Sequence, residues 1–163
     1  MESTKAQTIR YLQDLHAAEK LTEDILDKLA DDAEAVATVR TVAAECVRES
    51  TMRRETLEAR VRSLDGNLSS LKDFANSTMG VLSDIFNSGH NRADKITMDT
   101  IKAHAALHML HGSYCALSEF ATAVNDPDTQ QIAERYMEEA MASADRLMPA
   151  IRASARAAVS IPA

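Results

Sequence analysis

The sequence predicts an all-α protein, in which four long helices form two antiparallel hairpins joined by a long helical crossover. The chain has 163 residues, enough for a single domain over 1–163, and only four glycines and three prolines, so few positions interrupt a helix. Apolar residues recur at spacings of three and four, and β-branched residues never form a period-two run. The possible turns are short, except for one long segment at the middle of the chain.

The first two helices are predicted over residues 4–30 and 33–64. Capping-box patterns at Thr4 and Asp31 mark their starts, and Gly66 marks the end of the second helix. Because so few residues remain for the turn between them, the two helices should form an antiparallel hairpin.

The connector, residues 66–91, is rich in Ser, Asn and Gly but has enough apolar residues for one or two short helices. The third helix, 92–124, is apolar on nearly every side, which suggests a central position. Asp126 is a strong N-cap for the fourth helix, 127–159, in which Pro149 should introduce a kink. Two hairpins joined by one long connector have the ferritin-like topology. A simple up-down bundle is the alternative.

Composition excludes several function classes. The chain has 18 basic and 25 acidic side chains, a net charge of −7, and no basic cluster with aromatics, which argues against nucleic-acid binding. We find no secretory leader pattern and no apolar run of about 18 residues, so we expect a cytoplasmic protein with no membrane contact. Cys46 and Cys115 should be reduced and buried. Phosphate-loop, dinucleotide, zinc-cysteine and nucleophile-elbow motifs are missing from the sequence.

Three of the expected helices place a glutamate on their inner face near mid-length: Glu19, Glu49 and Glu139. The third helix offers His108 and His111 instead. Carboxylates that face one another repel unless a cation lies between them, and four-helix metal sites use carboxylates and imidazoles projecting into the core. These five residues are therefore candidate metal ligands, present or vestigial.

Four further polar residues border the same inner faces and could form a hydrogen-bonded network. The guanidinium of Arg53 stays protonated, so it would repel a metal ion and could neutralise an inner carboxylate. In such a network His108 and His111 should satisfy Glu19 and its neighbours. The further network residues are His16, Glu23, Arg53 and His104.

Five segments follow one another along the chain: LQDLHAAEKLTEDIL, AECVRESTMRRETLEARVRSLDG, TMGVLSDIFNSG, HMLHGSYCAL and YMEEAMASADRL. In this order they resemble the YciE/YciF-type ferritin-like family, the first segment its first-helix signature and the second its second helix. The resemblance covers most of the chain. It implies a fold like that of diiron-carboxylate ferritins, an association with stress responses, and inward positions for Glu19, Glu49 and Glu139.

The sequence departs from the metal-binding pattern of these relatives. A dinuclear centre of this type uses four glutamates and two histidines. Leucines stand where the family's third helix has glutamates, and both histidines of the Glu-x-x-His pairs are replaced. The departures are Leu107, Leu110, Cys46 for histidine, Arg53 for glutamine, and Met52 and Ala142 for the paired histidines.

Three functions remain open. The favoured one is a non-enzymatic or degenerate ferritin-like protein, without a cofactor, whose inner polar network replaces a dinuclear centre. The second is a protein that binds iron, manganese or zinc and performs oxidase or peroxide-related chemistry on an unknown substrate. The third is a helical protein-interaction module. A homodimer is expected because the helix over 92–124 is apolar all round.

Overall fold

The computed structural model describes residues 2–68 and 92–159, and within these ranges the chain is all-α, without strands. Its helices are α1 (Thr4–Asp31), α2 (Ala37–Ser63), α4 (Arg92–Ala123) and α5 (Pro127–Val159). The short helices expected in the connector fall almost entirely outside these ranges. None of the described helices has the length and apolarity needed to cross a membrane.

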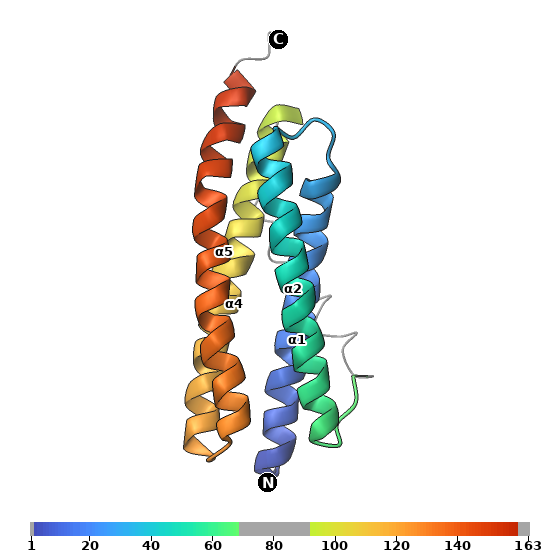
Figure 1. The fold of residues 1–163 in the computed structure, drawn as a ribbon, viewed down its shortest axis with the longest axis vertical. Helices are drawn as coiled ribbons and strands as arrows, with labels where there is room; N and C mark the ends of the chain where they lie inside the picture. Colours follow the sequence, from blue (N-terminus) through green and yellow to red (C-terminus); the bar gives the residue numbers. More distant parts are fainter. Residues whose placement is uncertain (1, 69–91, 160–163) are drawn as a thin grey trace.

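The four helices form a bundle of two antiparallel hairpins, α1 with α2 and α4 with α5 (Figure 1). The hairpins pack together through contacts of α1 with α4 and of α2 with α5. In Figure 1, α2 ends at the bottom of the bundle whereas α4 begins at the top, so these two helices run in the same direction. This is the relation that a ferritin-like crossover requires, and it confirms the predicted fold class.

The first hairpin turn differs from the prediction. Ser3 rather than Thr4 caps α1, because the Oγ of Ser3 accepts the N–H of Ala6 at 3.2 Å. The second helix begins at Ala37 rather than at residue 33, because the Asp32 carboxylate accepts the N–H of Glu34 at 2.9 Å and holds a local turn. The turn therefore extends to residue 36.

The end of α2 explains the glycine that follows it. Gly66 donates its N–H to the carbonyl of Val61 at 2.9 Å, and Asp65 adopts a positive φ of 57°, which together close the helix in a Schellman turn. A Cβ on Gly66 would lie 2.9 Å from Val61 Cγ1 and 3.0 Å from Ile9 Cγ2. The glycine is thus needed for its small size.

The start of α5 is fixed as the sequence predicts. The Asp126 carboxylate accepts the N–H of Thr129 at 3.1 Å, which is an N-cap interaction. Arg60 of α2 reaches the same carboxylate with an Nη2 to Oδ1 distance of 2.6 Å. The second hairpin is therefore tied to α2 at this end of the bundle. Pro149 lies inside α5, which continues to Val159.

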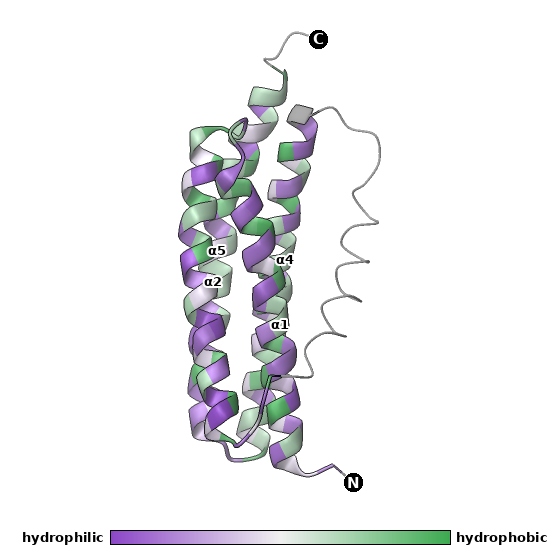
Figure 2. Cartoon of the chain, turned by 90° about the vertical axis from the view of Figure 1, so that its right-hand side faces the viewer, coloured by the Kyte–Doolittle hydropathy of each residue, from purple (hydrophilic) through white to green (hydrophobic). Residues whose placement is uncertain are grey.

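The core is built mainly from leucine and alanine, and hydrophobic residues alternate with hydrophilic ones along the helices (Figure 2). Burial of each such leucine contributes roughly 2 kcal/mol to folding. The fully buried leucines are Leu12, Leu26, Leu57, Leu107, Leu110, Leu117 and Leu147.

Only one of the two cysteines is buried. Cys46 lies in the core, as expected, whereas Cys115 is exposed. Leu110, Tyr114 and Leu117 form the buried face of α4. Cys115 lies about 100° around the helix from Tyr114, so its side chain points away from this face. The prediction for Cys115 was wrong because a helix that is apolar on every side shows no inward stripe in its sequence.

Candidate functional site at the centre of the bundle

A buried ion pair joins α1 to α2. Glu19 and Arg53 both have side chains with an exposed fraction of 0 %. Arg53 Nε lies 2.7 Å from Glu19 Oε1, and Arg53 Nη2 lies 3.4 Å from Oε2. The guanidinium therefore approaches both oxygens of the carboxylate, which is the strongest arrangement for this pair.

Two hydroxyl groups complete the surroundings of the Glu19 carboxylate. Tyr114 of α4 donates its O–H to Oε1 at 2.7 Å, and Ser50 of α2 donates to Oε2 at 2.5 Å. Ser50 and Tyr114 are also fully buried. We call Glu19, Ser50, Arg53 and Tyr114 the central network.

The fourth helix joins the central network through an aromatic contact. The ring of Tyr136 on α5 packs edge-on against the ring of Tyr114, with the centroids 5.7 Å apart. Tyr136 donates its O–H to Thr56 Oγ1 at 2.7 Å. All four described helices thus meet around Glu19.

The charges and hydrogen bonds of the central network favour one protonation state of Arg53 and of Tyr114. Burial alone would lower the pKa of Arg53, but the charge of Glu19 and its hydrogen bond hold that pKa above its usual value. Burial, and next the charge of Glu19, raise the pKa of Tyr114 well above its usual value. At neutral pH the guanidinium is therefore charged and the phenol protonated. Arg53 Nη1 has no hydrogen-bond partner among residues 2–68 and 92–159.

Glu49 and Glu139 do not join Glu19, contrary to the prediction. Glu49 accepts a hydrogen bond from Ser143 at 2.7 Å and forms an ion pair with Arg146. Glu139 pairs with Arg135 on the same helix, at 2.8 Å. The inward positions next to them are instead occupied by Ser50 and Ala140, each one residue further along its helix.

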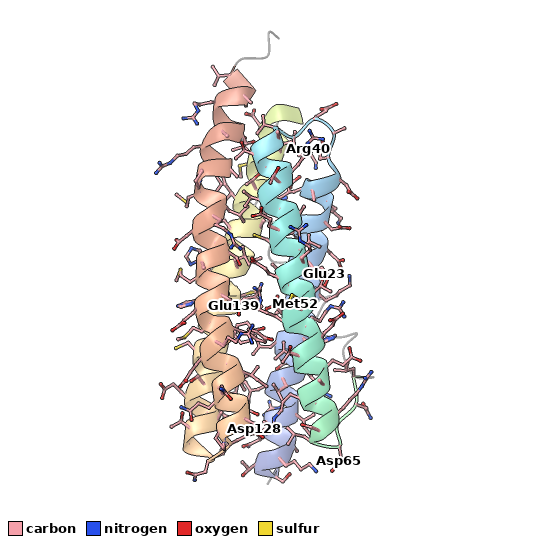
Figure 3. All side chains as sticks on the ribbon, viewed as in Figure 1. Glu23, Arg40, Met52, Asp65, Asp128 and Glu139 are labelled. Atoms are coloured by element: carbon pink, nitrogen blue, oxygen red, sulfur yellow. The ribbon has the colours of Figure 1, made fainter. Side chains whose placement is uncertain are left out.

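Both glutamates line an open depression of about 250 Å³ between α2 and α5. Figure 3 shows Met52 on α2 and Glu139 on α5 at similar heights along the bundle. The depression is also lined by Met52, Arg135, Tyr136, Ala142 and Arg146. Its two carboxylates already have arginine partners, so it is a neutral surface feature rather than a cation site.

The histidines of α4 do not reach Glu19 either. His108 is exposed, and its Nε2 lies 3.3 Å from Nε2 of His104. Burial, and next the neighbouring His108, lower the pKa of His104, while Asp145 acts in the opposite direction. His111 uses Nδ1 to contact the carbonyl of Met137 at 3.0 Å. The prediction that His108 and His111 satisfy Glu19 was wrong, because Arg53, Tyr114 and Ser50 do so.

His16 and Glu23 lie outside the central network. His16 is buried, and neither ring nitrogen has a hydrogen-bond partner in the described part of the chain. Burial, and next the charge of Arg54, lower the pKa of His16, with Glu58 and Glu23 opposing. Glu23 pairs with Arg54 at 3.0 Å. Of the four expected network residues, only Arg53 forms a hydrogen bond or ion pair with Glu19.

The sequence analysis did not identify Ser50 and Tyr114, although their helical spacing to other inward residues could have done so. Ser50 follows Cys46 by four residues and precedes Arg53 by three, which places it on the same face of α2. Tyr114 has the same spacing relative to Leu110 and Leu117. A hydroxyl on a face shared with a buried charge is a candidate donor to that charge.

The donor set does not fit a dinuclear metal centre. A dinuclear centre needs a Glu-x-x-His pair facing the core on two of the helices. Next to Glu49 and Glu139, the buried residues with this spacing are Ser50 and Arg53 on α2, and Ala140 and Ser143 on α5. On α4, leucines are buried where the resemblance expects glutamates. Both oxygens of the remaining carboxylate are engaged by Arg53, Tyr114 and Ser50. Within the described ranges, no group of three or more His, Cys, Asp or Glu residues is placed to hold a metal ion.

Comparison with known proteins places the chain in a family. The model of a family described as a domain of unknown function (DUF892) matches residues 7–160. The chain belongs to the DUF892 family. This family is part of the ferritin-like superfamily, in agreement with the bundle. No curated protein matches the chain.

A solved structure is similar to this DUF892 chain over nearly its whole length. It is a crystal structure of a protein from Xanthomonas campestris pv. campestris, with 20% sequence identity and a TM-score of 0.78, and the match covers 97% of each chain. At this identity the likeness shows that the two chains share the four-helix fold.

We expect Tyr114→Phe to lower the free energy of unfolding by about 1–3 kcal/mol, because it removes a hydrogen bond to a buried charged group. Tyr136→Phe is the matched control, since its hydroxyl serves the neutral Thr56; here the loss should be about 0.5–1.5 kcal/mol. Urea denaturation of both variants measures the difference. Equal losses would show that Tyr114 is not a specific partner of Glu19.

Proposed function

We propose that this DUF892 protein is a non-enzymatic ferritin-like protein in which the central network stands in place of a dinuclear metal centre. The observation that carries the proposal is the distance of 2.7 Å between Arg53 Nε and Glu19 Oε1, with both side chains fully buried. A guanidinium cannot be deprotonated in a protein. The positive charge that a metal ion would bring to Glu19 is therefore supplied by the chain itself.

A metal ion at Glu19 would have to displace Arg53. The guanidinium would then be left buried beside a cation, and an uncompensated buried charge costs several kcal/mol. Leu107 and Leu110, both fully buried, offer no replacement ligand on α4. These features favour the network over the metal-binding alternative with oxidase or peroxide-related chemistry.

Metal analysis tests the proposal. We expect protein purified without a chelator or a metal column to contain well below one equivalent of iron or manganese, and His108→Ala to contain well below one equivalent of zinc as well. Added Fe(II) should leave the melting temperature unchanged. Stoichiometric iron that is lost in Glu19→Gln would contradict the proposal. His108→Ala, which removes an exposed imidazole, controls for metal held at the surface.

A further inference from the structure

Two histidines on the outer face of α4 face each other across one helical turn. His104 and His108 are four residues apart, so their side chains lie on the same face. Their Nε2 atoms are 3.3 Å apart, and the two ring planes are inclined at 68°. His108 is exposed and His104 is half-buried. The two nitrogens therefore meet at the solvent boundary, where an ion can reach them.

The separation of these nitrogens matches the geometry of a bound metal. Zinc holds imidazole nitrogens at about 2.0–2.1 Å in a tetrahedral arrangement, so two nitrogens on one ion lie about 3.3–3.4 Å apart. Without a metal, atoms at this distance share a proton, with one ring donating and the other accepting. Binding requires only that each ring carry its proton on Nδ1, which leaves both Nε2 lone pairs free.

We propose that His104 and His108 form a two-imidazole chelate for a divalent transition metal of the zinc and copper class on the surface of α4. Water molecules would complete the coordination. Asp145 of α5 is near enough to act electrostatically on His104, and its negative charge favours a cation at this place. Imidazole ligands select zinc and copper over magnesium and calcium.

The chelate is separate from the central network. The Glu19 carboxylate is fully buried and bound by Arg53, Tyr114 and Ser50, whereas His108 is in solvent. A chelate with two protein ligands also agrees with the finding that no cluster of three or more ligands exists among residues 2–68 and 92–159. Because only two protein ligands hold it, we expect the bound metal to exchange readily with solution.

Zinc titration tests the chelate. The full-length chain carrying Cys115→Ser, which removes an exposed thiol as a competing ligand, is titrated with Zn²⁺ by calorimetry in the absence of other chelators. We expect one Zn²⁺ per chain, and His104→Ala or His108→Ala should each weaken binding about tenfold or more. His111→Ala is the matched control, because its Nδ1 is engaged by Met137, and its affinity should not change.

Several outcomes would overturn the chelate. They are the absence of saturable zinc binding, binding that survives either substitution, and a loss in His111→Ala as large as in His108→Ala. Far-UV circular dichroism of each variant checks that the helices are intact. His104→Gln and His108→Gln repeat the comparison with larger side chains, and they should show the same loss.

Discussion

Arg53→Met should lower the free energy of unfolding by about 3–5 kcal/mol, because it leaves the Glu19 carboxylate buried without its counter-charge. Methionine keeps much of the side-chain volume, so the loss reports the charge rather than a cavity. Urea denaturation at neutral pH measures it. Arg62→Met is a matched control, since Arg62 is exposed and pairs with Glu58; this change should cost less than about 1 kcal/mol.

Leu110→Glu should also lower the free energy of unfolding by about 3–5 kcal/mol, because it buries a carboxylate without a partner. Leu110 is fully buried one turn before Tyr114, at a position where the resemblance expects glutamate. If the bundle retained a latent metal centre, this change would restore a ligand. We expect instead that added Fe(II), Mn(II) or Zn(II) does not recover the lost stability.

Two comparisons make the Leu110→Glu result specific. Leu110→Met keeps the position apolar at nearly the same volume and should cost less than about 1.5 kcal/mol. The metals are added to Leu110→Glu in a His108→Ala background, so that surface imidazoles do not contribute. A melting temperature that returns to the unsubstituted value with one equivalent of metal would contradict the proposal that the central network stands in place of a metal centre.

Much of the fold could be predicted from the sequence. Apolar spacing places the helices, and the N-cap at Asp126 is present as expected. The other two predicted N-caps were wrong, because Ser3 caps α1 and α2 begins after Val36, without a side-chain cap. The hairpin turn was misplaced because two adjacent aspartates, Asp31 and Asp32, could each cap a helix. Only the three-dimensional turn shows that the Asp32 carboxylate binds the N–H of Glu34.

The candidate site was predicted in part. Glu19 was identified because a leucine stripe surrounds it, and Arg53 as a residue able to neutralise it. Glu49 was misplaced because neighbouring positions on a helix differ by only about 100°, and α2 has too few apolar residues to fix which of them points inward. The partner role of Tyr114 is a contact between distant segments, which helical spacing alone does not show.

The coupling energy between Glu19 and Arg53 tests the central claim most directly. It comes from a double-mutant cycle of Glu19→Leu, Arg53→Met and the double variant, followed by urea denaturation. We expect each single change to destabilise strongly and the double variant to recover most of the loss, because an apolar pair can replace a buried ion pair at little cost. A loss in the double variant equal to the sum of the two single losses would contradict the claim that these two residues neutralise each other's charge at the centre of the bundle.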